Sequence, residues 1–288
     1  MDNIIQFITE PFAYDFMQRA LIISILVGSV CAIFSCFLIL KGWSLMGDAV
    51  SHAILPGLAI AYMTGIPLAI GAFIGGLFCA VATGHIKNSC RVKEDAVMGI
   101  IFSGMFAFGL VLITRIESDI HLMHVLFGNV LGISHSDMVE AGTIAILCSL
   151  IMLIKRKDFM LYCFDAGQAN AIGLPVKLLN YSLLILLSLT IVSSLKAAGI
   201  ILVIAMLIAP GATAFLITKS FDHMLIIALC VSLISCITGV FFSYHADVST
   251  APLIVLIQSL MFLCALIRSI MHQEKIKTTA HQKDGTLL

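Results

Sequence analysis

Two side chains that can bind a transition metal stand four residues apart in an otherwise apolar part of the chain. Asp48 and His52 belong to the sequence Gly-Asp-Ala-Val-Ser-His-Ala-Ile-Leu-Pro-Gly, which runs from residue 47 to residue 57. In a helix this spacing places a carboxylate and an imidazole on one face, where both can reach the same ligand. A charged side chain at bilayer depth costs roughly 2.5–3.5 kcal/mol, so such residues usually face a cavity or a polar partner.

The pair has a chemical and a structural explanation. Carboxylate oxygen and imidazole nitrogen together suit manganese, iron and zinc ions alike. One aspartate and one histidine are too few for tight binding, but a transport pathway must release its cargo. Further ligands could come from another helix or from a second subunit. In the structural explanation, Asp48 only caps the start of its helix and His52 makes a hydrogen bond in the core.

Composition predicts that membrane-spanning helices carry this pair. Hydrophobic residues make up 60% of the 288 residues, charged residues make up 11%, and the mean hydropathy is +1.11. Soluble proteins are only about 45–50% apolar. Nine apolar segments are candidates to cross a hydrocarbon core of about 30 Å: 20–40, 49–64, 67–84, 96–114, 138–154, 178–195, 197–218, 224–244 and 248–267. Because several segments are short, one could be re-entrant. The sequence thus predicts an all-α polytopic membrane protein with eight or nine transmembrane helices.

The distribution of charge predicts the orientation in the membrane. The connections at 116–136 and 245–249 contain acidic residues and no lysine or arginine. Basic residues gather at Lys87, Arg91 and Lys93, at Lys155, Arg156 and Lys157, and at Arg268 with the C-terminal tail. By the positive-inside rule the basic connections and the C-terminus are cytoplasmic, and with nine spans the N-terminus is outside. Arg19 and Lys196 are exceptions to this arrangement.

The chain is expected to hold one membrane domain and no soluble catalytic domain. Residues 1–19 form an N-terminal segment, 20–270 the transmembrane domain, and 271–288 a polar tail that we expect to be frayed. No connection between spans is long enough for a core of its own, which needs more than about 40 residues.

The inner connection at 155–177, with its central part at about 158–175, has features of a short helix parallel to the membrane. Asp165 can cap the start of this helix, and Gly173 with Pro175 can end it. Ala169, Ile172 and Gly173 are expected to share one face. An ordinary interfacial connector is the alternative.

Two further patterns concern helix packing. Pro210 should bend its helix, which membranes tolerate where a neighbour satisfies the freed backbone groups. Gly71 and Gly75 have the spacing of a small-residue pair that suits close helix contact.

In the outer connection, His121 and His124 could collect cations, although a surface pair of this kind is more often incidental.

Several catalytic motifs are absent from the sequence. It contains no G-x-x-x-x-G-K-[ST], so a Walker-type ATP site is excluded, and neither H-E-x-x-H nor G-x-S-x-G occurs. We therefore expect no enzyme activity in this chain. An intramembrane hydrolase that uses Asp48 and His52 would have no nucleophile that the sequence identifies.

Three segments resemble the permease family of ABC importers for manganese, iron and zinc. Residues 47–57 are close to the family's G-D-A-x-S-H-A-x-x-P-G signature, residues 126–131 to its L-F-G-[ND] segment in an outer loop, and residues 164–173 to the segment that docks on the ATPase. With the pattern of spans, the resemblance covers about residues 15–270.

The resemblance implies a role for these segments. Asp48 and His52 would be metal ligands in the translocation path, and Asp165, Ala169 and Gly173 would belong to the coupling helix that contacts the ATPase. No permanently bound cofactor is implied, because the metal is cargo. Pro56 with Gly57 is more similar to the manganese and iron branch than to the zinc branch.

The resemblance also implies partners and a location. A second permease subunit, identical or a sister chain, would enclose the path, cytoplasmic subunits would hydrolyse ATP, and an extracytoplasmic protein would deliver the metal. The location would be a bacterial inner membrane, and no nucleic-acid partner is expected. The alternatives are an ATP-independent cation transporter or channel and an intramembrane enzyme.

Overall fold

The computed structural model describes residues 10–89, 94–115 and 132–284, and within these ranges it contains helices and no strand. Lipid cannot hydrogen-bond a backbone, so helices, which satisfy their own backbone groups, are the expected solution. The elements in chain order are η1 (Glu10–Ala13), α2 (Asp15–Lys41), α3 (Met46–Thr64), α4 (Leu68–Ser89), α5 (Glu94–Ile113), α7 (His135–Ile154), α8 (Arg156–Phe164), α9 (Ala166–Ala171), α10 (Val176–Ala198), α11 (Ile200–Ile217), α12 (Phe221–Ala246) and α13 (Thr250–Asp284). The predicted all-α class is confirmed.

In the described ranges, eight helices are long and apolar enough to cross a membrane. Helix α3 has the length, with 19 residues, but is not among the eight. It contains Asp48, Ser51 and His52, whose polarity lowers its hydropathy. The predicted apolar segments 49–64 and 67–84 are separate helices, divided at Gly65, which has a φ of 73°. The uncertainty between eight and nine spans therefore concerns the helix that carries the candidate site.

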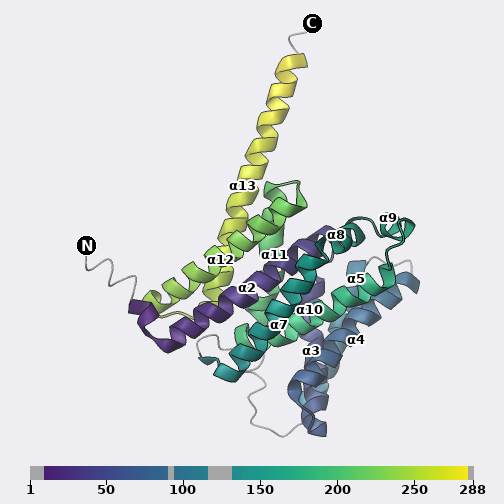
Figure 1. The fold of residues 1–288 in the computed structure, drawn as a ribbon, viewed down its shortest axis with the longest axis vertical. Helices are drawn as coiled ribbons and strands as arrows, with labels where there is room; N and C mark the ends of the chain where they lie inside the picture. The colour runs from purple at the N-terminus through teal and green to yellow at the C-terminus, as the bar shows by residue number, and fades with distance from the viewer. Residues whose placement is uncertain (1–9, 90–93, 116–131, 285–288) are drawn as a thin grey trace.

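Helix α2 is the most buried of the eight and lies in the middle of the bundle (Figure 1). It packs against α11 and α12 on one side and against α7 on another, while α3, α4 and α5 form a group of their own that is joined to the rest through α10 and α11. The short helices α8 and α9 lie at one end of the bundle, between α7 and α10 (Figure 1). The candidate metal ligands thus belong to a peripheral three-helix group, and the predicted coupling segment belongs to an end of the bundle.

Glycines bring α3 and α4 into backbone contact. A Cβ atom at Gly71 of α4 would overlap the carbonyl oxygen of Gly57 and the Cβ atom of Ala61, both on α3. One turn further along α4, a Cβ atom at Gly75 would lie 2.9 Å from the carbonyl oxygen of Ala53. The close helix contact predicted from Gly71 and Gly75 is confirmed, and its partner surface on α3 follows directly after His52.

A serine of a neighbouring helix forms hydrogen bonds with the backbone of α11 on both sides of its proline. Pro210 has no N–H group, and the next amide, Gly211 N–H, donates a hydrogen bond of 2.9 Å to Oγ of Ser35 on α2. The same hydroxyl donates to the carbonyl oxygen of Ile208 over 3.1 Å. Ser35 of α2 thus bonds one backbone donor and one backbone acceptor of α11 on either side of the proline.

The C-terminal tail differs from its prediction. Helix α13 continues without interruption to Asp284, so residues 271–284 are helical rather than frayed, and in Figure 1 this part projects away from the bundle. Residues 272–284 contain neither proline nor glycine and include good helix formers such as Gln, Glu and Lys. The other predicted boundary, after residue 19, falls inside α2, which begins at Asp15.

The α3–α4 contact predicts unequal effects of one substitution at two glycines of α4. Gly71→Ala should lower the midpoint of thermal unfolding in detergent, because overpacking against backbone costs about 1–3 kcal/mol. Gly84→Ala is the matched control, since a Cβ atom there would meet no heavy atom within 4 Å. Equal unfolding temperatures for both variants and the original chain would contradict the packing described for α3 and α4.

Candidate metal site

Asp48 and His52 face each other on the first two turns of α3. The distance between Asp48 Oδ1 and His52 Nε2 is 3.3 Å, as expected for residues four apart in a helix. The helix begins after Leu45, which provides no side-chain cap. The structure thus shows the Asp48 carboxylate beside His52 rather than as the cap of α3. Its position in the first helical turn still places negative charge at the favourable end of the helix dipole.

The distance within the pair matches what a single divalent cation requires. Two ligand atoms each about 2.1 Å from one ion lie about 3.0–3.4 Å apart for angles between octahedral and tetrahedral. The His52 side chain is 29% exposed and that of Asp48 is 35% exposed, so both can be reached from outside the chain. Among the described residues, no group of three or more His, Cys, Asp or Glu side chains could hold a metal ion. In the described ranges, Asp48 and His52 thus stand as a candidate pair without a third such side chain beside them.

Two aromatic rings from α5 hold the imidazole. The ring centroid of His52 lies 5.1 Å from that of Phe102 and 5.3 Å from that of Phe106, the second pair being edge-to-face. Such contacts restrict the rotation of the imidazole and keep Nε2 directed at Asp48. The sequence reasoning missed these residues. The four-residue spacing of Phe102 and Phe106 on one helix was the signal that could have indicated them.

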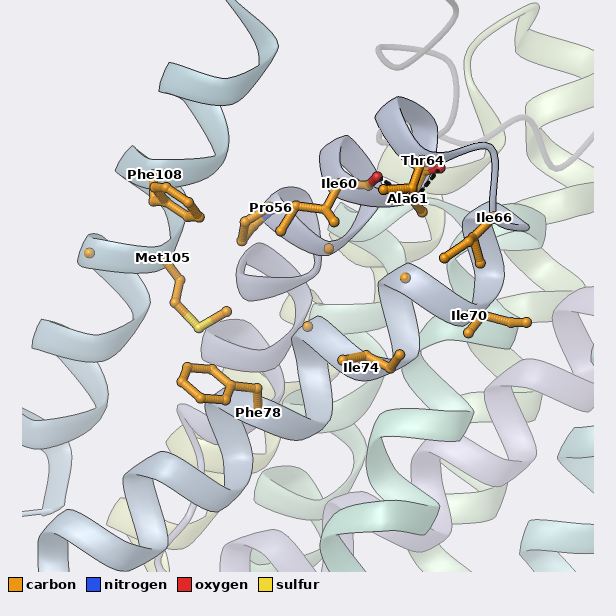
Figure 2. Close-up of a pocket in the computed structure, with 14 residues that line it drawn as sticks. Pro56, Ile60, Ala61, Thr64, Ile66, Ile70, Ile74, Phe78, Met105 and Phe108 are labelled. Carbon is orange, nitrogen blue, oxygen red and sulfur yellow. Dashed lines mark hydrogen bonds between the residues drawn. The ribbon is translucent and has the colours of Figure 1, made fainter.

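An apolar cavity begins one turn beyond His52. Its volume is about 500 Å³, and Figure 2 shows side chains from α3, α4 and α5 around it, including Pro56, Ile74, Phe78, Met105 and Phe108. The lining also includes Thr64, whose hydroxyl donates to the carbonyl oxygen of Ile60 over 2.8 Å, within its own helix. This surface offers a metal ion no further charged or imidazole ligand. The polar site is thus bounded by an apolar face.

The predicted coupling segment is built as two helices rather than one. Helix α8 ends at Phe164, and the Asp165 carboxylate caps α9 by accepting hydrogen bonds from Gly167 N–H over 2.8 Å and Gln168 N–H over 3.0 Å. Gly173 follows α9 with a φ of 84°, and Pro175 precedes α10. The predicted start at Asp165 and the end at Gly173 and Pro175 are therefore confirmed as local structure.

One part of the coupling prediction is wrong. Ala169 is fully buried, whereas the side chain of Ile172 is 63% exposed and Gly173 lies beyond the end of the helix. The three residues do not share a face, because α9 ends at Ala171, before the second turn that would bring them together. Phe164 and Ile172 instead present apolar surface outward at the two ends of α9.

Two sequence predictions lie outside the described residues. The segment 126–131 in the outer connection and the pair His121 and His124 both fall within 116–131, which the structure does not describe.

Known proteins resemble this chain over most of its length. The chelated iron transport system membrane protein YfeD of Yersinia pestis is 61% identical to this chain, over 93% of this chain and 90% of its own length. The manganese transport membrane protein MntB of Synechocystis is 50% identical over 90% of this chain and 85% of its own. A solved structure of PsaBC from Streptococcus pneumoniae, in complex with a Fab, contains a chain that is 37% identical, with a TM-score of 0.80, covering 91% of this chain and 95% of that one.

The family itself is identified by a match that includes both candidate segments. The ABC 3 transport family matches residues 13–269, a range that contains Asp48, His52 and the α8–α9 segment. The chain therefore belongs to the ABC 3 transport family of membrane proteins.

Proposed function

We propose that this chain is the permease subunit of an ATP-driven importer of divalent transition metal ions, with manganese and iron favoured and zinc as the alternative. The observation that carries the proposal is the pairing of Asp48 Oδ1 and His52 Nε2 at 3.3 Å on a partly exposed face of α3. The ion is the substrate, and Asp48 and His52 bind it during passage. The names of YfeD and MntB, which refer to iron and manganese, support this choice of metals.

The pair is suited to transient binding. With two ligands from this chain the ion is held weakly, and its coordination is completed by a second permease subunit, identical or a sister chain. Without the ion, His52 Nε2 and Asp48 Oδ1 lie 3.3 Å apart, so each group keeps the other as its polar partner. The mutual contact thereby reduces the cost of releasing the ion.

Energy for the cycle comes from other subunits. The chain has no Walker motif, so separate cytoplasmic subunits bind and hydrolyse ATP. They dock on the α8–α9 segment, where Phe164 and Ile172 expose apolar surface around the buried Ala169. A metal-binding protein on the outer side of the bacterial inner membrane delivers the ion. The pathway then alternates between outward and inward access as the ATPase subunits close and open.

Removing both ligands should abolish metal uptake. We expect the double variant Asp48→Ala, His52→Ala to take up no Mn²⁺ or Fe²⁺ in a deletion strain, while its abundance in the membrane and its assembly with the ATPase are retained. Radiolabelled metal uptake with quantified membrane protein measures this. Uptake equal to that of the original chain would refute the role of the pair, and metal transport by the purified chain alone would favour the ATP-independent transporter or channel.

Loosening the imidazole should weaken the apparent affinity for metal. Phe106→Ala removes one of the two rings that hold His52, and an aromatic contact of about 0.5–1.5 kcal/mol corresponds to a two- to tenfold higher half-saturating concentration of Mn²⁺. Phe108→Ala is the matched control, because that ring is 53% exposed on the same helix. Identical saturation curves for the two variants would show that the ring contact with His52 has no influence on binding.

A further inference from the structure

A lysine in the last turn of α2 contacts the end of α8, beside the packing of Phe37 on α2 against Phe159 on α8. Lys41 Nζ donates a hydrogen bond of 3.3 Å to the carbonyl oxygen of Tyr162 and lies 4.0 Å from the centroid of the Tyr162 ring. Tyr162 is in the final turn of α8, where carbonyl oxygens lack helical donors and the helix dipole favours a cation. Lys41 therefore satisfies the end of α8 at the point where the chain turns into α9.

This contact is buried and supported from a third helix. Tyr162 is 4% exposed, and its hydroxyl donates a hydrogen bond of 2.7 Å to Oδ1 of Asn180 on α10. The neighbouring Cys163 is also buried, which raises the pKa of its thiol to about 12, with the nearby positive charge of Lys41 opposing that shift. Because the groups around Lys41 are enclosed and paired, α8 cannot shift against α2 without breaking these contacts.

On its other side, Lys41 is joined to the metal-binding helix by a short and well-fixed turn. Gly42 adopts a φ of 77°, and the amides of Gly42 and Trp43 donate back to Ile39 and Leu38 over 3.1 and 2.8 Å. The Trp43 side chain is 4% exposed, and its carbonyl oxygen accepts from the amide of Met46, the first residue of α3, over 3.0 Å. Asp48 follows two residues later.

We propose that Lys41 is a positioning residue that transmits movement of the α8–α9 segment to α3, and thereby changes the placement of Asp48 and His52. The proposal rests on the proposed function, since it requires an ATPase that moves α8–α9. A cation held by both a carbonyl oxygen and an aromatic face resists separation as well as compression, so α8 and the end of α2 move as one body. The turn at 42–45 then carries this displacement to the first turn of α3.

Another lysine of the same region makes no such connection. Lys155 pairs with Asp158 over 3.4 Å within one turn of chain, and its side chain is 61% exposed. Exposed pairs of this kind have little energetic effect. Substitution by methionine keeps the aliphatic stem of a lysine and removes its charge. Lys155→Met, at an exposed pair, is therefore a matched control for Lys41→Met, at the contact between two helices.

The test uses the complete transporter reconstituted in liposomes, with the ATPase, the partner permease and the binding protein present. We expect Lys41→Met to reduce the number of Mn²⁺ ions transported per ATP hydrolysed by about tenfold, a typical size for coupling between sites, while ATP hydrolysis continues. Lys41→Arg should restore most of this ratio, and Lys155→Met should leave it unchanged. A normal ratio in Lys41→Met would overturn the proposal and leave the importer itself intact, whereas Mn²⁺ transport by the original complex without ATP would refute the proposed function.

A measurement on the unmodified chain covers the case in which Lys41→Met fails to assemble. Cys163 serves as the reporter, because it is buried beside Lys41, and its reaction with N-ethylmaleimide can be followed by mass spectrometry. If α2 and α8 move together, buried Cys163 stays protected at the same slow rate with and without ATP. Faster labelling of Cys163 in the ATP-bound state would show that α8 separates from α2, which would overturn the proposal.

Discussion

The pairing of polar groups at bilayer depth shapes the candidate site and its surroundings. An unsatisfied hydrogen-bonding group in lipid costs several kcal/mol, so a polar side chain at this depth is stabilised when a partner is supplied. Ser51 illustrates the simplest solution, since its hydroxyl donates to the carbonyl oxygen of Gly47 on the same helix over 2.7 Å. Ser35 extends the solution between helices at the proline of α11. Asp48 and His52 use each other over 3.3 Å, and in the proposed function theirs is the pairing that a metal ion replaces.

That replaceable pairing depends on how its surroundings are packed. Glycines let α3 and α4 touch through their backbones, and Gly109 of α5 approaches Pro56 so closely that a Cβ atom there would lie 2.8 Å from the proline nitrogen. These contacts fix the distance from α3 to α5, and with it the placement of Phe102 and Phe106 against His52. The candidate ligands on α3 are thus positioned by α4 and α5. The start of α3 is connected through the turn at 42–45 to the end of α2, which contacts α8.

Much of the fold followed from local sequence features, and the differences have physical causes. Hydropathy predicted the helices, and Asp165, Gly173 and Pro175 predicted the ends of α9, because capping and left-handed turns depend on single residues. The expected shared face of Ala169 and Ile172 was wrong, since the helix stops one residue too early for its periodicity to apply. The tail was helical because residues 272–284 contain neither proline nor glycine to interrupt α13.

The spacing of Asp48 and His52 predicted their proximity, but not what surrounds them. The four-residue spacing of Phe102 and Phe106 marks a shared face of α5, but the contact of that face with His52, about fifty residues away, depends on tertiary packing, as does the contact between Lys41 and Tyr162. The same reasoning applies to the ligands that a second subunit would add.

The central claim is that a divalent metal ion binds His52 nitrogen and Asp48 oxygen within the assembled transporter. Pulsed electron paramagnetic resonance on the purified complex loaded with Mn²⁺ tests this directly, because a coordinated imidazole nitrogen produces a resolved coupling. The account predicts such a coupling in the original complex and its loss or reduction in His52→Gln. A spectrum with oxygen ligands alone in the original complex, or an unchanged nitrogen coupling in the variant, would contradict it.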